Sequence, residues 1–98
     1  MAFVVSEKEG PHGILMVITD EDIVGKMFVE GKVQLDLTAS FYKGIIQTKE
    51  DVGKNVHRAK DIHFTGREAV ALGVEQSLIE PKRILWVKGV PHAESVLG

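Results

Sequence analysis

The sequence predicts an α+β fold in which a small mixed or antiparallel sheet packs against two or three helices. Strands and helices are expected in the order strand, strand, helix, strand, strand, helix, helix, strand, which differs from the regular alternation of doubly wound folds. The chain has 98 residues, of which 44% are hydrophobic and 27% charged, as expected of one globular domain. No repeat and no linker rich in Pro, Gly or Ser divides it, so residues 1–98 are predicted to form a single domain.

The first two strands are predicted to form a hairpin. Residues 3–6 are a short apolar strand, and the polar stretch 7–13, with two glycines and a proline, predicts the turn. Residues 14–18 are a continuous apolar run, which is typical of a central strand buried on both faces. Thr19 followed by three acidic residues predicts the start of a helix, which Gly25 keeps short.

The middle of the chain predicts two further strands and an amphipathic helix. Residues 32–38 alternate between apolar and polar side chains, as in a half-buried strand, and residues 41–46 predict a turn and a short strand. Residues 48–51 then repeat the helix-start pattern of a hydroxyl followed by acidic residues. The apolar face of this helix is expected to contain Val52, Val56 and Ala59, with a mostly basic face opposite.

The last third of the chain predicts another helix and a final strand. Thr65 and Glu68 have the spacing of a capping box, which predicts a helix start, and Pro81 is expected to end that helix. The broad apolar surface of the helix indicates burial on two sides. Residues 84–87 predict the final strand, and residues 89–93 predict a turn that leads to a short tail.

Several function classes are disfavoured by what the sequence lacks. It contains no cysteine, so disulfides, cysteine-based zinc sites and thiol catalysis are all excluded. A phosphate-binding loop, a nucleotide-binding glycine motif and a nucleophile elbow are absent, which argues against an enzyme and predicts no cofactor. The four histidines lack the spacing of a helical metal pair, so no metal site is predicted, while a site assembled in space stays open. Neither a signal-peptide pattern nor a membrane-spanning apolar run is seen, so a cytoplasmic protein without a membrane partner is expected.

Positive charge is concentrated in one segment of the chain. Residues 43–67 carry a net charge of +3, whereas residues 1–42 carry −4 and residues 68–98 carry −1. Cations beside an aromatic ring are typical of single-stranded RNA recognition, in which the ring stacks on bases and the cations meet phosphates. The candidate nucleic-acid-binding residues are therefore Tyr42, Lys43, Lys54, His57, Arg58, Lys60 and Arg67.

Interpretations of these residues without a binding role stay open. The basic helix face can equally be ordinary solvated surface, and Tyr42 can be half-buried at a sheet edge. Trp86 lies in an apolar strand and is expected to be a core residue rather than a stacking platform. No preference for DNA follows from the sequence.

Four short motifs, taken in order, resemble a known family. They are Asp-Glu-Asp-Ile-Val-Gly-Lys at 20–26, Phe-Tyr-Lys-Gly at 41–44, Gly-Arg-Glu-Ala-Val at 66–70 and Gly-Val-Pro-His-Ala at 89–93. Together they resemble a small archaeal family catalogued as domain of unknown function 424, although this chain has His-Phe-Thr at 63–65, where family members often have an Asn-rich turn. The resemblance implies a stand-alone single-domain protein, sometimes described as RNA-binding, and supplies no catalytic residue. Lys26 and His92 lie beside the glycine turns of these motifs and are further candidate site residues.

The function expected from sequence is a non-catalytic module that associates with RNA or the ribosome in archaeal translation or RNA processing. Its basic helix would contact phosphates. A second hypothesis is a protein-interaction or homodimerisation domain that uses apolar surface near Trp86 or the Val70 helix and binds no nucleic acid. A third and weaker one is a small hydrolase or transferase with His92 in a pocket.

Overall fold

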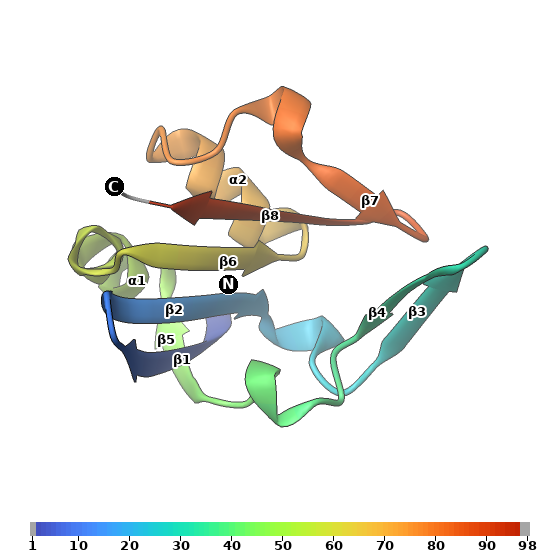
Figure 1. Cartoon of the computed structure of the whole chain (residues 1–98), viewed down its shortest axis with the longest axis horizontal. Coiled ribbons are helices and arrows are strands. Elements are labelled where there is room, and N and C mark those ends of the chain that lie inside the picture. Colours follow the sequence, from blue (N-terminus) through green and yellow to red (C-terminus); the bar gives the residue numbers. More distant parts are fainter. Residues whose placement is uncertain (1, 97–98) are drawn as a thin grey trace.

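A computed structural model describes residues 2–96, which form a six-stranded mixed sheet and a separate two-stranded ribbon (Figure 1). The strands of the sheet lie in the order β5-β1-β2-β6-β8-β7. Their bounds are β1 (Ala2–Gly10), β2 (Gly13–Asp20), β5 (Ile45–Thr48), β6 (Asp61–Thr65), β7 (Leu85–Val87) and β8 (Val90–Val96). The ribbon consists of β3 (Met27–Glu30) and β4 (Val33–Asp36), and it projects from one side of the sheet in Figure 1. Strands β2 and β6 are parallel, and the other pairs of neighbouring strands are antiparallel.

The main core lies between one face of the sheet and two short helices, α1 (Lys49–Asn55) and α2 (Arg67–Glu75). Its strand residues alternate along each strand, so their side chains point to the same face. They are Phe3, Val5, Met16, Ile18, Ile62, Phe64 and Ala93. The α+β prediction is thus confirmed in its coarser form, as a mixed sheet made mostly of strands with two short helices. Among residues 2–96, no helix has the length and apolar character needed to cross a membrane.

The predicted hairpin is confirmed, but its strands are longer than expected. Strands β1 and β2 pair from Phe3 opposite Asp20 to Gly10 opposite Gly13, which leaves only Pro11 and His12 in the turn. The sequence predicts that the polar residues before Pro11 belong to the turn. They extend the strand instead, because ladder hydrogen bonds use the backbone and tolerate exposed polar side chains.

The prediction of a helix after Thr19 is wrong. Thr19 and Asp20 end β2, and only a single 3-10 turn, Glu21–Ile23, follows. Asp20 instead caps α2, since its carboxylate accepts hydrogen bonds from the N–H groups of Glu68 and Ala69, at 3.0 and 2.7 Å. By contrast, the start of α1 is as predicted, because the Thr48 hydroxyl accepts from the N–H of Asp51 at 3.2 Å.

Both strands at the centre of the C-terminal half were missed. Residues 61–65, expected to include a turn, form β6, and residues 90–96, expected to be a turn and a tail, form β8. The capping box predicted at Thr65 is also wrong, because Thr65 ends β6 and Gly66, with a φ of 108°, occupies the position before α2. Helix α2 ends at Glu75, well before Pro81. Just after the helix, Ser77 adopts a φ of 61°, and the N–H of Leu78 donates to the carbonyl of Gly73.

The face of the sheet opposite the helices is only partly covered. A 3-10 turn at Ser40–Tyr42 and the β3–β4 ribbon lie against it, around a small second core of Leu35, Leu37 and Val87. This arrangement leaves a groove between Tyr42 and the β8–β7 side of the sheet.

Candidate functional site

The basic residues around α1 are exposed, but they do not form a purely basic face. Arg58 donates to Glu7, with Nη2 and Oε1 2.6 Å apart, and Lys49 Nζ lies 3.1 Å from Glu75 Oε2. Helix α1 also carries Glu50 and Asp51 in its first turn. The surface is therefore of mixed charge rather than uniformly positive.

Three of the candidate lysines form no ion pair. Lys43, Lys54 and Lys60 are exposed, and none of them forms an ion pair within residues 2–96. His57 is exposed as well, with Nε2 3.4 Å from Oε1 of Gln76. Lys54, His57, Arg58 and Lys60 lie in α1 or just after it, whereas Lys43 follows the Ser40–Tyr42 turn, which packs on the other face of the sheet.

Arg67 lies apart from that surface. Lys60 immediately precedes β6 and Arg67 immediately follows Gly66 beyond its other end, so the five residues of β6, about 16 Å of strand, separate them. Arg67 lines two hollows, one with Asp20 and Asp22 and one with Trp86. Its guanidinium is therefore available to a ligand in either hollow and not to one bound at α1.

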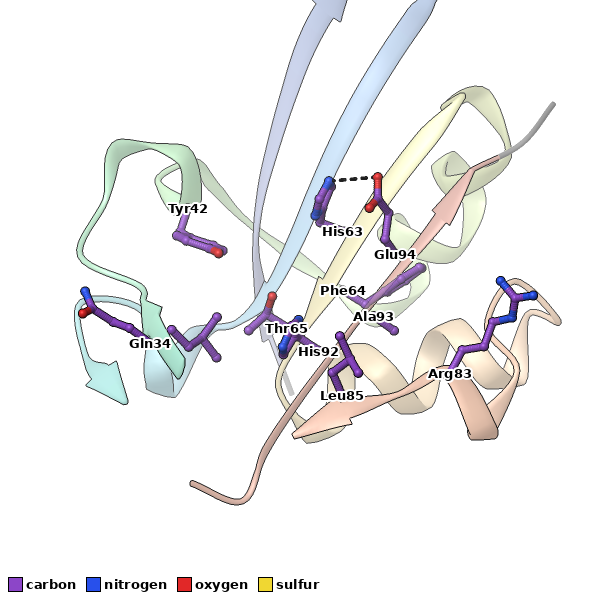
Figure 2. A pocket seen from close by; sticks show the side chains of 11 residues that line it. Gln34, Tyr42, His63, Phe64, Thr65, Arg83, Leu85, His92, Ala93 and Glu94 are labelled. Atoms are coloured by element: carbon purple, nitrogen blue, oxygen red, sulfur yellow. Dashed lines mark ion pairs between the residues drawn. The ribbon is translucent and has the colours of Figure 1, made fainter. Parts of the chain in front are cut away.

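The groove on the open face of the sheet, here called the sheet groove, has a volume of about 640 Å³. Figure 2 shows that its side chains come from β4, the 40–42 turn, β6, the 3-10 turn Pro81–Arg83, β7 and β8. Those with polar groups include Gln34, Tyr42, His63, Arg83, His92 and Glu94.

Two predicted site residues, Tyr42 and His92, both line the sheet groove. Tyr42 is half-buried, with its ring edge-to-face against Phe41 at a centroid distance of 5.1 Å. Burial raises the pKa of Tyr42, and the nearby charge of Asp36 adds to the rise. Burial lowers the pKa of His92, and the neighbouring His63 lowers it further. The groove therefore presents a phenol and a neutral imidazole, both of which form hydrogen bonds.

Lys26 does not line this groove. Its backbone forms two hydrogen bonds. The N–H donates to the carbonyl of Ile23 at 3.1 Å, and the carbonyl accepts from the N–H of Leu37 at 2.9 Å. Its side chain is exposed to solvent.

Two residues that line the sheet groove, His63 and Glu94, form an acid–histidine cluster with Asp61 beside it, which the sequence does not predict as a unit. His63 Nε2 lies 3.4 Å from Glu94 Oε2 and 4.0 Å from Asp61 Oδ1. The pKa of Glu94 is raised, chiefly by a hydrogen bond with the Asp61 carboxyl and then by burial. Asp61 Oδ1 is buried and has no hydrogen-bond partner among the described residues.

A pattern in the sequence could have found this cluster. Asp61-x-His63 and His92-x-Glu94 each place two polar side chains on one face of a strand, since side chains alternate along β structure. The strand register sets His63 opposite Glu94 and Thr65 opposite His92. The pattern is informative only where residues 61–65 and 90–96 are known to be strands.

A second hollow, here called the tryptophan groove, lies between α2 and β7 and has a volume of about 480 Å³. It is lined mainly by apolar side chains, among them Val70, Val74, Ile84, Trp86 and Pro91, with Arg67 at its rim. Trp86 is 56% exposed, so its expected place in the core is wrong. Strand β7 is the outermost strand of the sheet, which leaves the indole without a further strand to cover it.

Comparison with known proteins identifies the family and the fold. No curated protein matches the chain. An uncharacterized conserved protein from Methanopyrus kandleri has a similar crystal structure, with a TM-score of 0.80 and 17% identity over 100% of this chain and 95% of that one. The family model described as "Protein of unknown function (DUF424)" matches residues 7–96, so the chain belongs to this family.

Proposed function

We propose that this protein is a non-catalytic binding module that docks an apolar segment of a partner protein in the tryptophan groove. The observation that supports the proposal most strongly is the 56% exposure of Trp86 above an apolar floor. Contiguous apolar surface on a soluble domain usually marks an interaction site. Tryptophan is also enriched among the residues that contribute most to binding, because it buries a large apolar area.

The rim of the groove indicates the chemistry of the partner. Arg67 is exposed at the N-terminus of α2, and it forms no ion pair within residues 2–96. A carboxylate on the docked segment would meet its guanidinium, and apolar side chains would cover Trp86 and Val74. The partner is thus a protein segment that combines apolar residues with an acidic one.

The test compares Trp86→Ala with Leu85→Ala. Leu85 is 61% exposed but lines the sheet groove on the opposite side, so its substitution removes exposed apolar surface without touching the tryptophan groove. Recovery of one protein from native lysate, in constant stoichiometry and after RNase treatment, should survive Leu85→Ala and be lost with Trp86→Ala. The purified partner should bind the Trp86→Ala variant at least about tenfold more weakly.

Direct binding is measured through the indole itself. Trp86 is the only tryptophan, so its fluorescence should shift to the blue when a partner covers it. Equal recovery by both variants would overturn the proposal. A two-chain mass in light scattering that Trp86→Ala abolishes would instead identify a second copy of the chain as the occupant.

RNA binding is a second candidate function, supported by Lys54 and Lys60, two exposed lysines in or just after the α1 region that form no ion pair within residues 2–96. An RNA-binding surface there predicts an affinity for single-stranded RNA that falls steeply with salt, because neutralised phosphates release counterions. The double substitution Lys54→Glu with Arg58→Glu should abolish this affinity. The control, Lys26→Glu with Lys32→Glu, changes the net charge equally at exposed positions away from α1 and should leave most of the affinity. Equal losses for both pairs would show that only overall charge matters.

A further inference from the structure

We infer that Asp61, His63 and Glu94 form a binding site for a divalent transition-metal ion such as Zn²⁺, open to the sheet groove. Each residue offers one ligand atom, and the three atoms all lie within 4.8 Å of one another. The inference concerns the sheet groove and is independent of the protein-docking function proposed for the tryptophan groove.

The backbone register brings the three ligands together. Residues His63 and Glu94 are directly opposite each other on β6 and β8, and Asp61 lies two residues before His63 on the same face. Directly opposed side chains on antiparallel strands have Cβ atoms about 5 Å apart, which suits two ligands of one ion. The ligand set therefore rests on two paired strands of the sheet rather than on mobile loops.

The distances between the ligand atoms fit a common metal centre. Two ligands of a tetrahedral zinc ion at bond lengths of about 2.1 Å lie about 3.4 Å apart. The separation of His63 Nε2 from Glu94 Oε2 is 3.4 Å, and that of His63 Nε2 from Asp61 Oδ1 is 4.0 Å. The second distance exceeds this value, so binding of both atoms to one ion requires the Asp61 side chain to rotate toward His63. The His63 ring is meanwhile held by the edge-to-face contact of Phe41, at a centroid distance of 5.4 Å.

The charges at the cluster favour a cation. Asp61 and Glu94 form no ion pair with Lys or Arg within residues 2–96, and their only basic neighbour in an ion-pair geometry is His63. The Asp61 Oδ1 atom is buried without a hydrogen-bond partner among the described residues, which costs free energy that a metal ligand would not incur. A divalent ion would neutralise both carboxylates and use this oxygen.

The ligand types select a transition metal over Mg²⁺ or Ca²⁺. Imidazole suits zinc and its neighbours in the first transition row, whereas Ca²⁺ takes six to eight oxygen ligands and Mg²⁺ requires octahedral oxygen coordination. Three protein ligands leave at least one position for water or another ligand. The side chains of Asp61, His63 and Glu94 are 35%, 34% and 46% exposed, so that position faces the solvent of the groove.

Calorimetric titration of the full chain with Zn²⁺, after treatment with a chelator, tests the site. One ion should bind per chain, and Mg²⁺ or Ca²⁺ should bind far more weakly. His63→Gln and Glu94→Gln should each weaken Zn²⁺ binding by at least about 100-fold, since even outer-shell partners of metal ligands are worth 10–100-fold. The matched control is His12→Gln, which removes an exposed histidine in the β1–β2 turn and should leave the affinity unchanged.

A spectroscopic readout keeps the test independent of variant folding. In the wild-type chain, Zn²⁺ should shift the imidazole NMR signals of His63 and leave those of His12 and His57 in place. Absence of Zn²⁺ binding by the wild type would overturn the inference. So would Mg²⁺ binding as tight as that of Zn²⁺, or a shift confined to histidines outside the cluster.

Discussion

At the scale of single residues, Asp20 shows how an acidic helix-start pattern can serve a distant helix. Its carboxylate accepts hydrogen bonds from the first turn of α2, which lies nearly fifty residues further along the chain. The cap of α2 comes from the end of β2, because the parallel pairing of β2 with β6 sets Thr19 beside Thr65 and so brings Asp20 to the first turn of α2. Local spacing carries no information about that pairing.

Removing this cap should destabilise the fold. Asp20→Ala leaves the N–H groups of Glu68 and Ala69 without their acceptor and is expected to lower the free energy of unfolding by about 2 kcal/mol. Asp22→Ala removes an exposed carboxylate two residues away and should change it by less than about 0.5 kcal/mol. Urea unfolding followed by Trp86 fluorescence measures both. Equal losses would show that general negative charge, rather than the two hydrogen bonds, stabilises α2.

The charge state of Asp20 should make stability depend on pH. Burial raises the pKa of Asp20 above its usual 3.8, and this effect outweighs the lowering by the two backbone hydrogen bonds. A folded-state pKa above the unfolded one means that the folded chain holds this proton more tightly. The free energy of unfolding of the wild type, relative to Asp20→Asn, should therefore be greatest below pH 3.8 and decline as the pH rises through the folded pKa. A difference that grows with pH in paired unfolding series would contradict the assignment.

At the scale of elements, β6 and β8 are strands that the hydrophobic periodicity of the sequence does not predict. Residues 61–65 alternate, with Ile62 and Phe64 buried in the main core and Asp61 and His63 on the other face. A run this short follows an amphipathic helix without a break in hydrophobic pattern, so it also fits a helix end and a turn. Pairing with β2 on one side and β8 on the other decides the conformation. The candidate metal ligands were missed for the same reason.

Two glycines, one in each helix, should respond oppositely to alanine. A Cβ at Gly73 would lie 2.8 Å from Cγ1 of Ile79 and 3.2 Å from the Phe64 ring, because α2 packs closely on the sheet. Gly73→Ala should destabilise the fold by about 1–3 kcal/mol through overpacking. At Gly53 in α1 the nearest atom is Gln76 Nε2 at 3.7 Å, so Gly53→Ala should stabilise by about 0.5–1 kcal/mol through helix propensity. Thermal unfolding of both variants checks the pair, and a shift of the same sign in both would refute the packing argument.

At the scale of the whole molecule, the charge of a chain segment does not predict a surface patch. The positive segment 43–67 runs through β5, α1 and β6, and so its cations are distributed from one end of β6 to the other. Acidic residues from elsewhere in the chain, Glu7 and Glu75, then pair with two cations at the α1 end. The number of basic residues and their exposure were predictable from sequence, whereas their neighbours depend on the strand order.

The β3–β4 ribbon is expected to open without unfolding the rest of the molecule. Its two strands pair only with each other among residues 2–96, and the second core beneath it buries just Leu35, Leu37 and Val87. Few buried contacts lower the free energy of local opening. Amide hydrogen exchange should therefore be faster over residues 27–36 than over residues 14–20 in β2. Because Gln34 and Leu35 line the sheet groove, such opening would also widen the approach to the acid–histidine cluster.

Substitution of Leu37, which is 1% exposed, should show whether the β3–β4 ribbon opens by itself or only together with the sheet. Leu37→Ala removes part of the second core and is expected to accelerate exchange over residues 27–36 severalfold while leaving residues 14–20 protected. Val33→Ala is the control, because Val33 lies in the same ribbon but is 56% exposed and outside that core. Uniform acceleration of all amides by Leu37→Ala would mean that the ribbon and the sheet unfold as one cooperative unit. Exchange confined to the ribbon would make it the mobile wall of the sheet groove, since the cluster itself stays on the paired strands β6 and β8.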